Sequence, residues 1–361
     1  MLIAAPLYLS GRAYPLAPVF ERLPAVPVPI DRVLLGVLVL ALAGVAVAPR
    51  PRSLAWAALA LSAVLAVGDQ SRWQPWFYQY VLMLAALALA RSAAETLAAW
   101  RFVLVALYVW SGLQKLNVTF ATRLFPWMLE PLTGPRSGDP GPLLIAAGVA
   151  AALVETAIGL SLLSVRLRNA GVVAAVLTHG FVLGLLGPLG HGQNYVIWPW
   201  NVALATFAVI LFWRADEPPR SIAVPRRAGV HAAAVILAGV LPAASFVGWW
   251  DAYLSGALYS GNIPAGLVAM NAPTLERLPP EARRHVETAG DKRVLDLWEW
   301  STAELRAPSY PEPRVFRRIG AELCRRANDP TDLVLVIFHR PAAIGGGREI
   351  TRDDCAALVR R

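Results

Sequence analysis

Long apolar runs separated by short polar turns occupy the first 250 residues of the chain. Eight runs can be counted, at 33–49, 53–68, 76–91, 96–116, 143–164, 169–187, 195–213 and 228–250. Several approach the roughly 20 residues that a helix needs to cross a bilayer, and tilting or pairing can accommodate the shorter ones. Backbone polar groups in lipid must be satisfied within the segment, so we expect α-helices. The pattern predicts an all-α polytopic membrane bundle of about eight transmembrane helices.

The pattern changes at both ends of the chain. Residues 1–31 contain closely spaced prolines, and we expect an irregular or interfacial segment there. Residues 251–361 are ordinary in composition and predict a small soluble α/β domain, joined to the transmembrane domain (32–250) by the aromatic, glycine-rich stretch 251–262. Within this C-terminal domain, two strands are expected at 266–270 and 333–338, and two helices at 279–288 and 314–326.

Composition indicates a membrane protein. Of the 361 residues, 57% are hydrophobic and 16% are charged, which is far from the balance of a soluble globular protein. The net charge is +9, but the arginines lie mostly in short loops and form no clustered basic face, so nucleic acid is not an expected partner. The alanine, arginine, proline and leucine content suggests a bacterial gene, and hence the bacterial inner (cytoplasmic) membrane with its lipid bilayer.

Loop charges predict the orientation of the bundle. The loops after the odd-numbered runs hold nine arginines, Arg50, Arg52, Arg91, Arg166, Arg168, Arg214, Arg220, Arg226 and Arg227. The loops after runs two, four and six hold only Arg72, Lys115, Arg123 and Arg136. By the positive-inside rule the first set is cytoplasmic. Both termini and the C-terminal domain are then expected on the extracytoplasmic side.

The two cysteines, Cys324 and Cys355, lie in the C-terminal domain and do not form a Cys-x-x-Cys motif. A structural disulfide and two free thiols are both compatible with this spacing, and we favour free thiols. No metal site is predicted.

Three polar clusters are expected to meet on the extracytoplasmic side. They occupy residues 69–80, the end of the fourth run, and residues 191–201. We expect their side chains to face one cavity and to bind a ligand; the candidate residues are Asp69, Arg72, Trp76, Tyr78, Tyr108, Asn117, Asn194, Trp198, Trp200 and Asn201.

Lys115, Glu155 and His179 are ionisable residues within or at the end of apolar runs. A charge at membrane depth costs roughly 2.5–3.5 kcal/mol on insertion scales, so such residues are rare and usually functional. Buried lysines lose their proton readily, which is how lysine bases arise. The alternatives are structural: Lys115 can snorkel from a helix end, His179 can be a packing residue, and Glu155 can be neutral, paired or hydrated. The tryptophans can equally form an interfacial aromatic belt.

Four segments, taken in order, resemble the HTTM (horizontally transferred transmembrane) superfamily, which includes the vitamin K-dependent γ-glutamyl carboxylases. They are Asp69-Gln-Ser-Arg-Trp-Gln-Pro-Trp-Phe-Tyr78, Ser111-Gly-Leu-Gln-Lys-Leu-Asn117, Glu155 ahead of Arg166 and Arg168, and Thr178-His179 followed by Tyr195-Val-Ile-Trp-Pro-Trp200. The resemblance covers about residues 30–215 and rests on order and spacing. The chain also resembles the DoxX/MauE group of small bundles, which carry a similar G-x-x-K-L element.

The resemblance implies roles for the ionisable residues. In the carboxylases the lysine that matches Lys115 is the proposed base toward reduced vitamin K. Lys115, Glu155 and His179 are therefore the candidate catalytic residues, and a quinone or reduced naphthoquinone is the candidate cofactor. This chain departs from the family pattern, because Trp76 stands in place of a histidine, Gln114 in place of a lysine and Asn117 in place of an aspartate. Together with a tail shorter than that of a carboxylase, these departures make γ-carboxylation itself doubtful.

Three functions stay open from the sequence. The first is quinone- or lipid-linked chemistry, as an oxidoreductase or a carboxylase-like lyase, with Lys115 as base and Glu155, His179 and Tyr78 in support. The second is a non-enzymatic accessory protein for maturation, immunity or partner binding, which would hold a lipid in the cavity or a protein on the C-terminal domain; transport is a third. Convergence of the three ionisable residues around a void would favour the enzyme, whereas Lys115 directed to lipid would exclude it.

Overall fold

The computed structural model describes residues 2–20, 23, 26–135, 138–341 and 347–359. The chain divides into two compact units. We call Leu38–Ser62 with Gln74–Asn262 the helical unit, and Met1–Val37 with Ala63–Trp73 and Ile263–Arg361 the sheet unit. Residues 251–262, expected as a link in the tail, thus belong to the helical unit.

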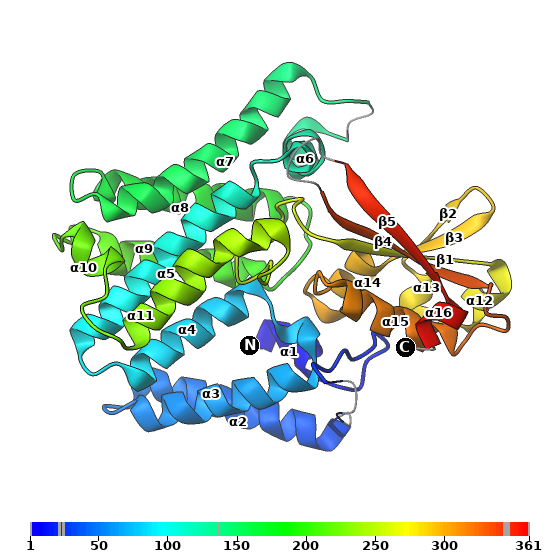
Figure 1. Cartoon of the computed structure of the whole chain (residues 1–361), viewed down its shortest axis with the longest axis horizontal. Helices are drawn as coiled ribbons and strands as arrows, with labels where there is room; N and C mark the ends of the chain where they lie inside the picture. The colour runs from blue at the N-terminus through cyan, green and yellow to red at the C-terminus, as the bar shows by residue number, and fades with distance from the viewer. Residues whose placement is uncertain (1, 21–22, 24–25, 136–137, 342–346, 360–361) are drawn as a thin grey trace. The chain divides into compact units, whose positions relative to one another are not determined.

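All eight apolar runs are helical (Figure 1). They form α2 (Val28–Val47), α3 (Arg52–Gly68), α4 (Pro75–Leu89), α5 (Ala93–Gln114), α7 (Pro142–Leu163), α8 (Arg168–Leu186), α9 (Ile197–Phe212) and the helical segment Val230–Val247. Five of these helices are long and apolar enough to cross a membrane: α2, α5, α7, α8 and Val230–Val247. The helices α3, α4 and α9 are shorter, so the count of eight membrane spans stays a prediction.

The turns that carry the nine predicted cytoplasmic arginines lie at one end of the helical unit (Figure 1). The helix α5 starts at this end and finishes at the other, where Lys115 caps it. Between α5 and α7, the chain forms a π-helix, η3 (Phe120–Leu124), and α6 (Phe125–Thr133). Arg136 of the opposite set lies outside the described residues.

The helices α5 and α7 cross in backbone contact. A Cβ atom added to Gly112 of α5 would lie 2.2 Å from Thr156 Oγ1 and 2.6 Å from the backbone oxygen of Ala152. A Cβ atom added to Gly159 of α7 would lie 2.9 Å from the backbone oxygen of Val105. Small residues at such crossings let two membrane helices approach closely, because dispersion contacts replace the hydrophobic effect in lipid. The two glycines therefore fix the distance between α5 and α7.

Residues 251–262 pack against the end of α5. Gly256 and Gly261 adopt positive φ values of 70° and 72°, and a Cβ on Gly256 would lie 3.1 Å from the backbone nitrogen of Ser111. Asn262 Nδ2 donates a hydrogen bond to Gln114 Oε1 at 2.6 Å. The positive φ and the close approach explain why this stretch is rich in glycine.

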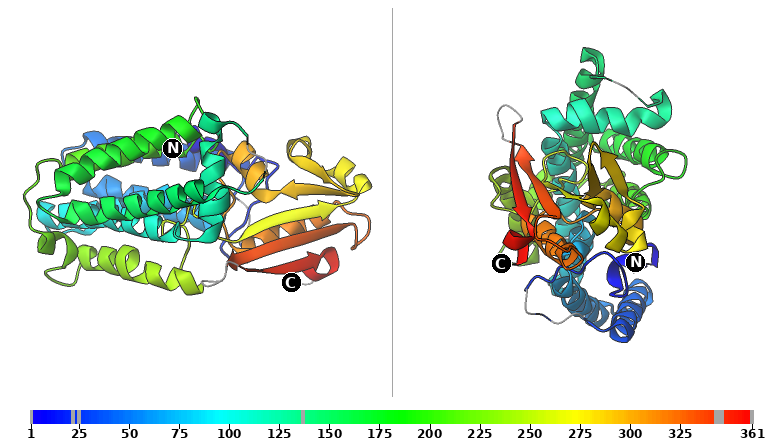
Figure 2. Two further views of the ribbon diagram at one scale, coloured as in Figure 1. Left: turned by 90° about the horizontal axis from the view of Figure 1, so that it is seen from above. Right: turned by 90° about the vertical axis from the view of Figure 1, so that its right-hand side faces the viewer.

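The sheet unit contains an antiparallel sheet in the order β2-β3-β1-β4-β5 (Figure 2). The strands are β1 (Ala265–Met270), β2 (Val286–Ala289), β3 (Lys292–Asp296), β4 (Leu333–Pro341) and β5 (Arg348–Asp354). The helices α14 (Leu297–Leu305) and α15 (Pro313–Cys324) pack on β1 and β4. Four short helices complete the unit: α1 (Ala5–Tyr8), α12 (Ala272–Arg277), α13 (Pro280–Arg283) and α16 (Cys355–Val359).

Three of the four elements that were predicted in this unit are present in the structure. The strands at 266–270 and 333–338 and the helix at 314–326 are confirmed as β1, β4 and α15. The helix expected at 279–288 is wrong in its second half, because α13 ends at Arg283 and Val286–Ala289 is strand β2. Pairing with β3, which turns back after Gly290, overrides the helix propensity of this stretch.

Cys324 and Cys355 form a disulfide, so the preference for free thiols was wrong. Cys324 ends α15 and Cys355 begins α16, two helices that pack together. The pairing places the two Cα atoms 5.4 Å apart, although 31 residues separate them in sequence. The sequence could not reveal this proximity, because it depends on how β4 and β5 return the chain to α15.

We expect Gly112→Ala to destabilise the helical unit by roughly 1–3 kcal/mol, since the added methyl overlaps the α7 backbone. Thermal unfolding of the purified protein in detergent measures this change. Gly180→Ala in α8 is the matched control, because no atom lies within 4 Å of its added Cβ. Equal melting temperatures for the two variants would contradict the proposed crossing.

Removing the disulfide with Cys324→Ser and Cys355→Ser should loosen α16 and lower the stability of the sheet unit by roughly 2–4 kcal/mol, as expected for closure of a loop of this length. Hydrogen exchange of full-length protein should show faster exchange in α15 and α16 and unchanged exchange in α5 and α7. Peptide mapping without reductant should recover the two cysteines as one cross-linked peptide. Free thiols in freshly purified protein would be the contrary result.

Candidate functional site

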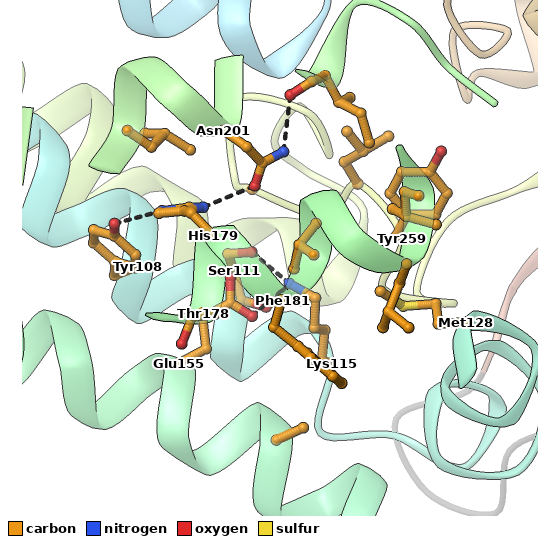
Figure 3. Close-up of a pocket in the computed structure, with 18 of the residues that line it drawn as sticks. Tyr108, Ser111, Lys115, Met128, Glu155, Thr178, His179, Phe181, Asn201 and Tyr259 are labelled. Carbon is orange, nitrogen blue, oxygen red and sulfur yellow. Dashed lines mark hydrogen bonds and ion pairs between the residues drawn. The ribbon is translucent and has the colours of Figure 1, made fainter. Parts of the chain in front are cut away.

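A cavity of about 160 Å³ lies inside the helical unit (Figure 3). Its walls come from α5, α7, α8 and α9, from Phe120, Phe125 and Met128, and from residues 256–259. Most of the wall is apolar. The polar side chains that line it are Tyr108, Ser111, Lys115, Glu155, Thr178, His179 and Asn201. The cavity is close in volume to the roughly 150 Å³ void that accommodates a benzene ring in an engineered protein core.

Lys115 and Glu155 form an ion pair across the α5–α7 crossing. Lys115 Nζ donates to Glu155 Oε2 at 2.7 Å, to Ser111 Oγ at 2.6 Å and to the backbone oxygen of Ser111 at 3.3 Å. The side chains are 13% and 21% exposed, so Lys115 turns inward and does not snorkel to the surface. The three acceptors use all three N–H groups of the ammonium. Among the described residues, Glu155 Oε1 accepts no hydrogen bond.

His179 is held at both ring nitrogens. Its Nδ1 lies 2.8 Å from Asn201 Oδ1, and its Nε2 lies 2.6 Å from the Tyr108 hydroxyl (Figure 3). Asn201 Nδ2 donates to the backbone oxygen of Ile197 at 2.8 Å, which orients the amide so that Oδ1 is the acceptor. The proton of neutral His179 is therefore on Nδ1, and Tyr108 donates its hydroxyl proton to Nε2. The hydroxyl oxygen of Tyr108 keeps acceptor capacity toward the cavity.

Six of the predicted site residues line the cavity together: Lys115, Glu155, His179, Tyr108, Trp200 and Asn201. They come from four helices that are distant in sequence. Trp200 is further anchored by a hydrogen bond from its Nε1 to Gln79 Oε1 at 2.6 Å. The three candidate catalytic residues thus converge around one void.

Five other predicted residues lie in the helical unit and do not line this cavity. Tyr78 donates to Asp251 at 2.9 Å, Asn117 Nδ2 donates to the backbone oxygen of Ser260 at 2.7 Å, and Trp198 Nε1 donates to that of Leu186 at 3.0 Å. Trp76 is buried, 5% exposed. Asn194 Nδ2 donates to the Tyr259 hydroxyl at 3.1 Å. These side chains hold loops and helix ends in place around the cavity.

Asp69 and Arg72 belong to the sheet unit, so the expected convergence of all three polar clusters on one cavity was wrong. Asp69 forms an ion pair with Arg12 and accepts a hydrogen bond from the backbone nitrogen of Ser71 at 3.1 Å. Arg72 donates to the backbone oxygens of Leu7, Leu65 and Tyr8. Both residues are fully committed to holding the N-terminal segment, a role that their sequence position alone does not reveal.

The sequence did not predict that residues 256–259 form part of the cavity wall. Gly256, Leu258 and Tyr259 line the cavity, and burial raises the pKa of Tyr259 to about 12. Its phenol therefore stays neutral and accepts the hydrogen bond from Asn194 as an uncharged group. The aromatic and glycine content of residues 251–262 was the available signal, and it was interpreted as a link.

Lysine is scarce in this chain. Of the 33 lysines and arginines, only Lys115 and Lys292 are lysines. A lysine in the cavity therefore stands out against a background in which arginine supplies nearly all positive charge. The compact ammonium fits between Ser111 and Glu155, whereas a guanidinium is larger and planar.

No family model, curated protein or solved structure matches this chain.

We expect Lys115→Met and Glu155→Met each to destabilise the protein, since each leaves a largely buried charge unpaired; losses of roughly 3–5 kcal/mol are typical when a fully buried pair is broken. The double variant should recover part of this loss, because both charges are gone. Thermal unfolding of the four proteins gives the coupling energy, expected at roughly 0.5–3 kcal/mol. Strictly additive losses would show that the two residues do not interact.

Proposed function

We propose that this chain is an integral membrane protein of the bacterial inner membrane that binds a small amphipathic molecule, a quinone, isoprenoid or lipid, in the cavity around Lys115 and Glu155. The single observation that carries the proposal is that an inward-facing Lys115–Glu155 pair and a fixed His179 line one ring-sized, mainly apolar cavity. Apolar pockets with a few convergent polar groups are the usual form of small-molecule sites.

The hydrogen-bond inventory suggests which part of a ligand would bind. The donors of Lys115 are used, and so are both ring nitrogens of His179. The groups with capacity left include Glu155 Oε1 and the Tyr108 oxygen, which are acceptors, and the hydroxyls of Ser111 and Thr178, which can act in either sense. A ligand headgroup that donates a hydrogen bond, such as the hydroxyl of a reduced quinone, isoprenoid or lipid, is therefore the best match, because the carbonyls of an oxidised quinone only accept.

In this geometry the proton acceptor is Glu155, assisted by Lys115, rather than Lys115 alone. A ligand hydroxyl beside Glu155 can give its proton to the carboxylate, and the neighbouring ammonium of Lys115 stabilises the negative charge left on the ligand oxygen. Tyr108 and His179 would orient the ligand and hold the wall of the site. Under the enzyme hypothesis, quinone- or lipid-linked chemistry would start from this step.

A non-enzymatic accessory role is the second candidate. It is favoured by the saturation of Lys115 and His179, since both side chains already have full sets of hydrogen-bond partners within the protein. A binding or maturation protein needs no proton transfer.

Two observations support an extracytoplasmic location for the sheet unit. The arginine-rich turns share one end of the helical unit, as the positive-inside rule requires of a cytoplasmic face. Disulfides persist in oxidising compartments such as the bacterial periplasm and are rare in the cytosol, and the sheet unit carries one.

Purified protein should release an amphipathic molecule on solvent extraction, and Lys115→Ala should release at least about tenfold less, because Glu155 loses the ion pair that holds its carboxylate in the cavity. Mass spectrometry of the extracts measures this. Lys292→Ala is the matched control, because Lys292 is the other lysine of the chain and lies exposed on β3. Size-exclusion profiles identify any variant that fails to fold. Equal release from folded Lys115→Ala and wild-type protein would overturn the proposed site.

A further inference from the structure

A second cavity lies at the arginine-rich end of the helical unit, at the opposite end of α5 from Lys115. Its volume is about 530 Å³. Its walls include the first turns of α5, the short helix α10 (Pro219–Ala223) and the turn before Val230. Three arginines line it, Arg101, Arg226 and Arg227, together with two glutamates, Glu95 and Glu217. The residues around Lys115 take no part in it.

Each glutamate already has a partner, although Glu217 Oε2 is buried and accepts no hydrogen bond from the described residues. Glu217 Oε1 pairs with Arg101 at 2.6 Å, and Arg101 also donates to the backbone oxygen of Leu211. Glu95 accepts a hydrogen bond from the backbone nitrogen of Arg91 at 2.9 Å, while its own backbone nitrogen is bonded to Ser92 Oγ. Glu95 thus helps to cap α5 at its N-terminus.

Two guanidinium groups at the cavity are accessible to a ligand. Arg227 forms an ion pair with Glu95 at 3.7 Å, which is too long for a hydrogen bond, and its side chain is 52% exposed. Arg226 is exposed and has no acidic partner within the described part of the chain. Adjacent arginines of this kind bind phosphate oxygens well, because each guanidinium offers two parallel donors.

The cavity also has an apolar wall that a free anion would not use. Ala94, Leu97 and Ala98 of α5 line it, and Leu97 is an exposed apolar side chain. Near the same helix ends, Trp213 is 44% exposed and has the guanidinium of Arg214 over its ring at 5.9 Å. Tryptophan with arginine at a helix end is typical of the membrane–water interface.

We propose that this cavity binds an anionic phospholipid of the cytoplasmic leaflet, with Arg226 and Arg227 on the phosphate and an acyl chain against Leu97. Basic pockets between membrane helices on the cytoplasmic side bind such headgroups. The inference rests on the membrane placement proposed above and is independent of any ligand at Lys115. It gives a binding role to Arg226 and Arg227, two of the arginines that predict the orientation of the bundle.

The test uses full-length purified protein in mild detergent, with native mass spectrometry to count bound lipid. Phosphatidylglycerol and phosphatidylcholine of equal chain length are titrated separately, and inorganic phosphate is added in competition. Wild-type protein should bind phosphatidylglycerol about tenfold more tightly than phosphatidylcholine, and Arg226→Gln/Arg227→Gln should lose most of that preference. Arg214→Gln/Arg220→Gln removes the same charge from exposed residues outside the cavity and should keep the preference for phosphatidylglycerol.

Three results would overturn the proposal. They are equal losses in the two double variants, equal binding of the two lipids by wild-type protein, and displacement of phosphatidylglycerol by millimolar phosphate, which would indicate a free-anion site. Lys115→Ala should bind phosphatidylglycerol as wild-type does. Failure of the lipid-binding test therefore does not contradict the proposed site at Lys115. Failure of the extraction test at Lys115 likewise does not contradict the lipid site at Arg226 and Arg227.

Discussion

The backbone contact between α5 and α7 is the constraint on which the helical unit depends. Gly112 and Gly159 leave no room for a methyl group, so the two helices lie at a fixed separation. That separation sets Lys115 within 2.7 Å of Glu155, and the end of α5 in turn supports residues 251–262. Burying a lone lysine or a lone glutamate would be costly, whereas the crossing lets each neutralise the other.

The two ends of the helical unit have opposite electrostatic character. At one end a single lysine is enclosed and its charge is balanced within the cavity. At the other, arginines outnumber carboxylates, and Glu95 and Glu217 each pair with an arginine. The first arrangement suits a neutral ligand with one polar group, and the second suits an anion.

The sequence predicted the helices well, because apolar length is a local property that lipid and protein interiors both demand. It also singled out Lys115, Glu155 and His179, which line one cavity, since charged groups in apolar helices are rare and costly to expose to lipid. Asp69 and Arg72 were misplaced because their partners, Arg12 and the carbonyls of Leu7 and Tyr8, lie some 60 residues away along the chain. The Cys324–Cys355 bond was missed for the same reason, because 31 residues separate the two cysteines. Val286–Ala289 was missed for a local reason, because it pairs with β3 across the turn at Gly290 and does not form a helix.

The scarcity of lysine has a practical consequence. Lys115 and Lys292 are the only side-chain amines of the chain, one enclosed and one exposed. An amine-selective acylating reagent will therefore mark Lys292 as an internal standard for reagent access. The extent of acylation at Lys115, measured against that standard, reports how accessible the ion-paired amine is to the reagent, without any substitution in the chain.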